Sequence, residues 1–162
     1  MRSERETMEA LEKAIYREIG ASRFYSSIAD KITNPGGRKK FKEIAEDEKK
    51  HRDKLESWYN KLSEETFRVT EEKIEQSEIK QISLNERTGA EKALDIAIEA
   101  ELKANDFYSE QADKADNREL KELYLSLAEE EQGHYNFLVA EKNAVAGGFY
   151  WFDMDSTAFM ED

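Results

Sequence analysis

Each of the two histidines in the 162-residue sequence follows a glutamate by three positions. His51 comes after Glu48, and His134 comes after Glu131. On an α-helix, side chains three positions apart project from the same face, so the carboxylate and the imidazole of each pair can reach one ion. The sequence contains no cysteine, which excludes disulfides, thiolate zinc sites and iron–sulfur clusters. Any metal must therefore be held by carboxylate oxygen and imidazole nitrogen.

A further glutamate precedes each pair at the same distance. Glu18 lies 30 positions before Glu48, and Glu101 lies 30 positions before Glu131. All four acids interrupt rows of apolar residues, where burial of an unpaired carboxylate is unfavourable. No lysine or arginine is expected in those rows, so two divalent or trivalent cations would neutralise the acids, with the imidazoles completing the ligand set. The contrary interpretation, in which the acids are solvated and the histidines merely pack, would expose apolar neighbours such as Leu11 to water.

Apolar residues at helical spacing predict four long helices that position these side chains. We expect them at about residues 4–32, 36–63, 88–115 and from Asn117 to about 145. Ser3 with Glu6, and Thr88 with Glu91, have the spacing of capping boxes that begin the first and third helices. Because no alternating pattern of comparable length predicts a sheet, the expected fold class is all-α.

The second half of the sequence repeats the first. A shift of 83 positions pairs residues 8–56 with 91–139 without a gap and aligns Phe24-Tyr25 with Phe107-Tyr108 as well as both Glu-x-x-His pairs. A duplicated αα-hairpin explains this repeat. The two hairpins, joined by a long crossover at about 64–86, predict a four-helix bundle with approximate two-fold symmetry.

The sequence resembles the ferritin-like di-iron carboxylate superfamily and, within it, rubrerythrin-type proteins. The resemblance rests on the Glu-x-x-His pairs, the Glu-x6-Tyr spacing from Glu18 to Tyr25 and the Ala-Glu-Asp-Glu-x-x-His run at 45–51, and it covers about residues 5–143. It implies a ferritin-like four-helix bundle, here residues 1–146, that binds two iron ions. Manganese is an alternative to iron in one or both positions, because carboxylate and imidazole ligands suit both metals.

The resemblance also implies a role for each residue of the set. It makes Glu18 and Glu101 the terminal ligands, Glu48 and Glu131 the bridging carboxylates, and His51 and His134 the imidazole ligands.

Four further residues match the family's outer contacts. By resemblance, Asp47 and Glu130 hydrogen-bond the imidazole of the opposite hairpin, and Tyr25 and Tyr108 hydrogen-bond a ligand carboxylate. The alternative for these four is that the acids are solvated and the tyrosines only fill the core.

Two departures from rubrerythrin affect the expected activity. Ala104 stands where the family has an extra glutamate that exchanges with a histidine as the irons change oxidation state, and the cysteine-ligated rubredoxin domain has no counterpart. We therefore expect a redox enzyme without catalytic residues beyond the metal centre, which reduces peroxide or dioxygen with electrons from an external donor such as a rubredoxin-type protein. The alternatives are a ferroxidase or iron-handling protein, an oxygenase, and a non-catalytic bundle whose metals are structural.

Composition limits the partners. Asp and Glu number 37 against 25 Lys and Arg, and the formal net charge of −12 argues against nucleic acid. No apolar run is long enough to cross a membrane, and the charged N-terminus does not resemble a secretory signal, so a cytoplasmic location is expected. Similar proteins are commonly homodimers, some with exchanged helices. We expect the aromatic C-terminal tail, residues 147–162, to pack on the bundle or on a partner subunit.

Overall fold

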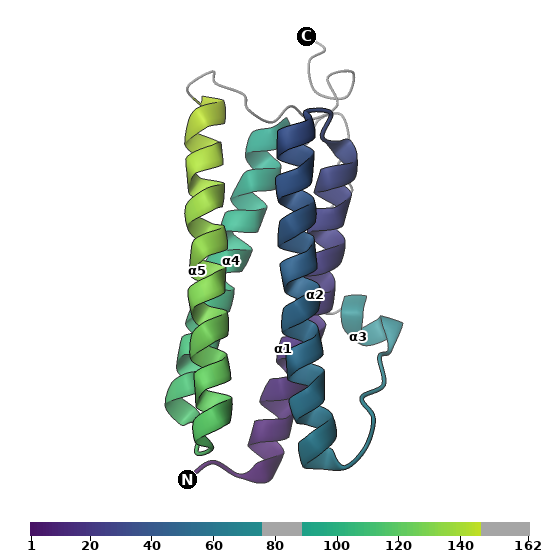
Figure 1. Ribbon diagram of the computed structural model, residues 1–162, viewed down its shortest axis with the longest axis vertical. Coiled ribbons are helices and arrows are strands. Elements are labelled where there is room, and N and C mark those ends of the chain that lie inside the picture. Colours follow the sequence, from purple (N-terminus) through teal and green to yellow (C-terminus); the bar gives the residue numbers. More distant parts are fainter. Residues whose placement is uncertain (76–88, 147–162) are drawn as a thin grey trace.

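Four long helices that run along one axis form the molecule (Figure 1). The computed structural model describes residues 1–75 and 89–146 of the chain. Within these ranges the helices are α1 (Glu4–Lys31), α2 (Pro35–Ser63), α3 (Glu71–Glu75), α4 (Gly89–Lys114) and α5 (Arg118–Ala146), and no strand occurs. The predicted all-α bundle of two hairpins is confirmed, with α1 packed against α2 and α4 packed against α5. None of the described helices combines the length and apolar character needed to cross a membrane.

Matching caps begin the second helix of each hairpin. The Asn34 side chain accepts a hydrogen bond from the Gly37 backbone N–H at 3.0 Å, and the Asn117 side chain accepts one from Leu120 at 3.0 Å. Both bonds satisfy an N–H that has no partner inside its helix. Only residues 32–34 and 115–117 connect the paired helices, so the turns are short and each hairpin is antiparallel.

The predicted capping box at the start of the chain is confirmed. The Ser3 hydroxyl accepts from the Glu6 backbone N–H at 3.1 Å, and the Glu6 carboxylate accepts from the Ser3 N–H at 3.3 Å. The predicted box of Thr88 and Glu91 depends on Thr88, which lies outside the described residues, as does the tail at 147–162 whose packing was predicted.

Buried apolar side chains form two clusters that lie at different heights along the bundle. One contains the later residues of α1, the early part of α2 and the start of α4, including Phe24, Phe41 and Leu94. The other contains the early part of α1, the later part of α4 and the start of α5, including Leu11 and Leu127. The glutamates and histidines of interest fall between the two clusters on every long helix, so the fold surrounds them with apolar side chains.

The segment after α2 packs on the outside of α1. The Tyr16 hydroxyl accepts from the Thr70 backbone N–H at 3.0 Å, and the Phe67 ring lies 5.5 Å from the Tyr16 ring and 4.9 Å from the Tyr59 ring, centroid to centroid. This segment then enters α3, which contacts α1. The described part of the expected crossover therefore contains a short helix, and residues 76–88 lie outside the description.

Glu141 on α5 is buried, with 5% of its surface exposed, and its Oε2 has no hydrogen-bond partner among the described residues. Burial raises the pKa of its carboxyl to about 7. Between the unfolded value near 4.5 and this folded value, the folded chain holds a proton that the unfolded chain releases, so this group reduces stability as the pH rises through that window. We expect Glu141→Gln to stabilise the fold at pH 8 by about 1–3 kcal/mol and to have little effect at pH 4.5. Urea denaturation of both proteins at both pH values tests this, and an equal difference at the two pH values would contradict it.

Candidate metal centre

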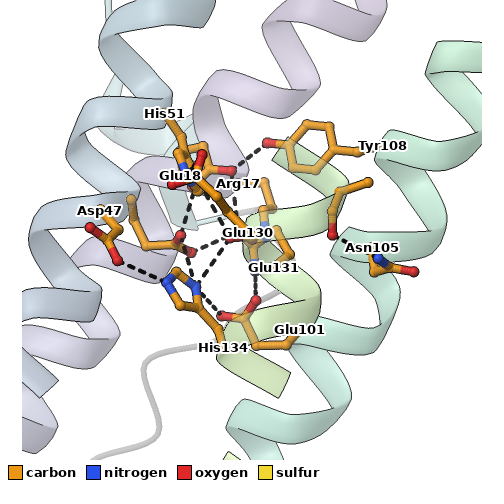
Figure 2. Close-up of polar contacts among 12 residues, drawn as sticks. Arg17, Glu18, Asp47, His51, Glu101, Asn105, Tyr108, Glu130, Glu131 and His134 are labelled. Atoms are coloured by element: carbon orange, nitrogen blue, oxygen red, sulfur yellow. Dashed lines mark hydrogen bonds and ion pairs between the residues drawn. The ribbon is translucent and has the colours of Figure 1, made fainter. Parts of the chain in front are cut away.

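The four long helices bring the six predicted ligands together in the middle of the bundle (Figure 2). Each helix contributes from its buried face, and the four glutamates have no exposed surface at all. His51 and His134 are 1% and 7% exposed. The six residues are Glu18 of α1, Glu48 and His51 of α2, Glu101 of α4, and Glu131 and His134 of α5.

These side chains form two groups of possible metal ligands, and the groups overlap. One contains Glu18 and His51 and the other contains Glu101 and His134, while both contain Glu48 and Glu131. In each group one ligand atom from every residue lies within 4.8 Å of all the others. Two carboxylates that belong to both groups have the arrangement required to bridge two ions.

Both imidazoles direct Nδ1 towards the carboxylates. His51 Nδ1 lies 3.2 Å from Glu48 Oε1 and 3.4 Å from Glu131 Oε1. His134 Nδ1 lies 3.2 Å from Glu131 Oε1 and 3.5 Å from Glu48 Oε1. The two rings are stacked with centroids 6.2 Å apart, so the histidines occupy one side of the cluster together.

The other ring nitrogen of each histidine faces an acid of the opposite hairpin. His134 Nε2 lies 3.0 Å from Asp47 Oδ2, and His51 Nε2 lies 3.3 Å from Glu130 Oε2. Of these contacts, the one between His134 and Asp47 is a hydrogen bond, and the one between His51 and Glu130 is an ion-pair contact. A proton kept on Nε2 towards the acid leaves Nδ1 as the atom that would bind metal after losing its own proton.

Two buried tyrosines connect the hairpins. The Tyr25 hydroxyl of α1 donates to Glu101 Oε1 of α4 at 2.6 Å, and the Tyr108 hydroxyl of α4 donates to Glu18 Oε1 of α1. Burial raises the pKa of both tyrosines well above 10, so both hydroxyls keep the proton that they donate. Each tyrosine thus holds the carboxylate contributed by the other hairpin.

Tyr108→Phe is expected to destabilise the chain by about 1–3 kcal/mol, because the buried Glu18 carboxylate loses a charge-assisted donor. Urea denaturation in the presence of a chelator measures this change. Tyr124→Phe is a matched control, because Tyr124 is equally buried but its hydroxyl has no hydrogen-bond partner within residues 1–75 and 89–146. We expect the control to change stability by less than about 0.5 kcal/mol. Equal losses in the two variants would show that the hydrogen bond to Glu18 contributes nothing.

The expectation that no lysine or arginine reaches the acids is wrong. The Arg17 guanidinium lies among all four carboxylates, and its side chain is only 12% exposed. Nη1 donates to Glu48 Oε2 at 2.8 Å, to Glu18 Oε1 at 3.2 Å and to Glu131 Oε2, while Nη2 lies 3.6 Å from Glu101 Oε2. A guanidinium is long enough to reach the axis of the bundle from a position beside a ligand.

One sequence feature could have located Arg17. It lies between Ala14 and Ala21 in a row of three-and-four spacing on α1, and both alanines are fully buried. Small residues one turn before and after leave room for a long side chain that extends inwards. The repeat does not predict an inward-pointing arginine, because the residue 83 positions after Arg17 is Ala100.

Burial and neighbouring charges shift the pKa values of several residues in the cluster. Burial raises the pKa of Glu131 well above its ordinary value. At Glu48 burial also acts to raise the pKa, but Arg17, His51 and His134 together outweigh it and lower the pKa of that carboxyl. Burial opposes the charge on the imidazoles, yet their carboxylate neighbours raise the pKa of His51 to about 11 and that of His134 to about 12. The site thus stabilises positive charge at its centre.

The donor set fits a pair of metal ions. Six buried atoms that point into the cluster have no hydrogen-bond partner among the described residues: Glu18 Oε2, Glu48 Oε1, His51 Nδ1, Glu101 Oε2, Glu131 Oε1 and His134 Nδ1. Buried polar atoms are rarely left without partners, so six of them in two overlapping ligand groups fit a site for cations. Carboxylate oxygen with imidazole nitrogen suits iron and manganese.

Comparison with known proteins agrees with this geometry. The family model described as rubrerythrin matches residues 9–142, which include all of the residues described above. Among solved structures, the chain is similar to a hypothetical protein from Pyrococcus furiosus, with 30% sequence identity and a TM-score of 0.73. That similarity covers 88% of this chain and 91% of the other. No curated protein matches the sequence.

Proposed function

Because the chain belongs to the rubrerythrin family, we propose that its buried cluster holds two iron ions and that the protein is a di-iron redox enzyme. The observation that carries the proposal is the pair of overlapping ligand groups that share Glu48 and Glu131. In this proposal Glu18 and His51 complete one ion's ligands, and Glu101 and His134 complete the other's. Manganese in one or both positions is the alternative metal to test, since the donor atoms suit it equally.

The proposed reaction is the reduction of peroxide or dioxygen to water. Bound iron supplies one-electron oxidation and reduction, and the chain supplies ligation, orientation and burial. Asp47 and Glu130 orient the imidazoles, and the apolar clusters above and below exclude water from the site. Reduction of one peroxide to two waters consumes two electrons and two protons.

Those electrons must come from outside this chain. The sequence has no cysteine, so it offers no thiolate-bound iron of its own to act as a donor. We propose an external donor such as a rubredoxin-type protein. Ala104, a buried residue, offers no additional carboxylate near the cluster, so the ligand exchange of rubrerythrin is not part of this proposal.

Elemental analysis of protein purified without a chelator is the first experiment. We expect two irons per chain, a number set by the two ligand groups. The protein is then reduced and mixed with stoichiometric peroxide while the near-ultraviolet absorption of ferric iron is recorded. A fast rise supports a peroxide- or oxygen-reducing enzyme, whereas bound iron that peroxide does not oxidise would overturn the redox proposal.

Two further outcomes identify the alternative functions. Light scattering that shows a cage, together with uptake of ferrous iron beyond two per chain, would favour iron handling over peroxide reduction. A dimer, which we propose as the assembly, counts against storage. Protein that unfolds when its metal is removed, with no redox response after reconstitution, would favour a non-catalytic bundle.

A further inference from the structure

Arg17 and the two histidines lie on opposite sides of the carboxylates. Every glutamate presents one oxygen to the guanidinium and the other to an imidazole. The oxygens nearest Arg17 are Glu18 Oε1, Glu48 Oε2, Glu101 Oε2 and Glu131 Oε2. Those nearest the Nδ1 atoms are Glu18 Oε2, Glu48 Oε1, Glu101 Oε1 and Glu131 Oε1. The guanidinium therefore contacts the same four carboxylates that two metal ions would use.

A surface cavity of 610 Å³ begins on the other side of Arg17. α1 and α4 form most of its wall, with Tyr16, Ala104 and Phe107 as uncharged lining residues. The same wall carries charges of both signs, because Glu9, Glu12, Asp106 and Glu110 line it together with Lys13, Lys73 and Lys103, and Lys73 pairs with Glu12. Because Arg17 belongs both to this lining and to the carboxylate cluster, its side chain lies between the cluster and the cavity.

Charge balance makes the guanidinium and the metals alternatives. Two divalent cations carry four positive charges and neutralise the four carboxylates without any help from Arg17. A guanidinium that stayed in place would then lie beside two cations and carboxylates that those cations already neutralise, where burial of its charge is unfavourable. The cavity beside it offers space and the carboxylate of Asp106, which has no ion-pair partner among the described residues.

We infer that Arg17 is an internal counter-cation that competes with the metal ions for the four carboxylates, and that metal binding moves its guanidinium towards the cavity. This inference rests on the proposed metal site. It gives Arg17 two opposite effects: it stabilises the fold when metal is removed, and it weakens metal binding. A residue that merely supported the site would stabilise the fold and also strengthen metal binding.

Arg17→Met tests the competition, because methionine removes the charge and keeps an unbranched side chain. In a competition titration with a chelating dye, we expect the variant to bind Mn²⁺ at least about tenfold more tightly than the parent. With a chelator present, we expect its melting temperature to fall by roughly 10 °C. Arg17→Lys keeps the charge and should lie between the two. Arg23→Met is the control, because Arg23 lies on the same helix but pairs with Glu71 at 3.1 Å on the exposed surface.

A second measurement uses the unmodified chain and does not depend on whether the variant folds. Phenylglyoxal modifies accessible arginines, and the modified residues are identified by peptide mass. We expect Arg17 to be protected in the presence of a chelator and to react at least about fivefold faster once Mn²⁺ is bound, because the guanidinium then leaves buried carboxylates for the cavity. Arg23 should react equally under both conditions.

The outcomes separate this inference from the proposed function. If the parent chain binds no Mn²⁺ or iron, the metal site itself is wrong. If it binds metal but Arg17→Met binds no more tightly, or Arg17 stays protected when Mn²⁺ is bound, the metal site stands and the competition is overturned.

Discussion

Glu131→Gln is expected to reduce the iron content from two ions per chain to at most one. The Glu131 carboxylate belongs to both ligand groups, so its loss removes a ligand from both ions. Glutamine has the same shape but is a poorer ligand and cannot bridge as a carboxylate does. Glu18 belongs to only one group, so Glu18→Gln should weaken the binding of one ion and leave the other ion bound.

Iron per chain is measured by elemental analysis after anaerobic loading with ferrous iron and removal of the excess. Glu129→Gln is the matched control, because Glu129 lies two positions before Glu131 on α5 but is exposed. It should retain the full complement. Full iron content in Glu131→Gln would refute the assignment of this residue as a shared ligand, whatever the activity of the protein.

Metal binding should also raise thermal stability by a large amount. A ligand present at about 1,000 times its Kd stabilises a one-site protein by about 4 kcal/mol, which for a chain of this size corresponds to a rise in Tm of roughly 8–16 °C. The physical reason is that Arg17 contacts all four buried carboxylates, yet one oxygen of each has no hydrogen-bond partner among the described residues and is available to a metal ion. Scanning calorimetry with Mn²⁺ and with a chelator measures the difference.

His134→Ala tests whether this stabilisation comes from the central site. The imidazole supplies the nitrogen ligand of one group, so the variant should lose about half of the increase in Tm or more. A Tm that responds equally to Mn²⁺ in both proteins would place the binding elsewhere, since the acidic surface of a chain with net charge −12 can bind cations weakly.

Because the cluster lies between two apolar cores, substitutions in it can be tested with little disturbance of the fold. The side chains belong to helices whose buried faces are fixed by packing above and below, so a substitution such as glutamate to glutamine changes charge with little change in shape. Effects on metal content can therefore be separated from effects on folding. The chelator measurements provide that separation directly.

The repeat made most of the fold and all six proposed ligands predictable from sequence. Apolar residues at helical spacing located the long helices to within a few residues, because a periodic stripe and a cap such as Ser3 with Glu6 act locally. Glu18, Glu48 and His51 were identified because acids and imidazoles are rarely buried in an apolar row without a partner. Their counterparts 83 positions later have the same spacing.

Tertiary structure alone decided how these residues meet. The resemblance placed Tyr108 near a ligand carboxylate, but only the packing of one hairpin against the other makes it donate to Glu18 of α1. Arg17 was missed because a long flexible side chain can turn inwards or outwards from the same backbone position, and that choice depends on charges contributed by three other helices. Local spacing determines the backbone position of a side chain, whereas the charges of residues on other helices determine the direction in which a long side chain extends.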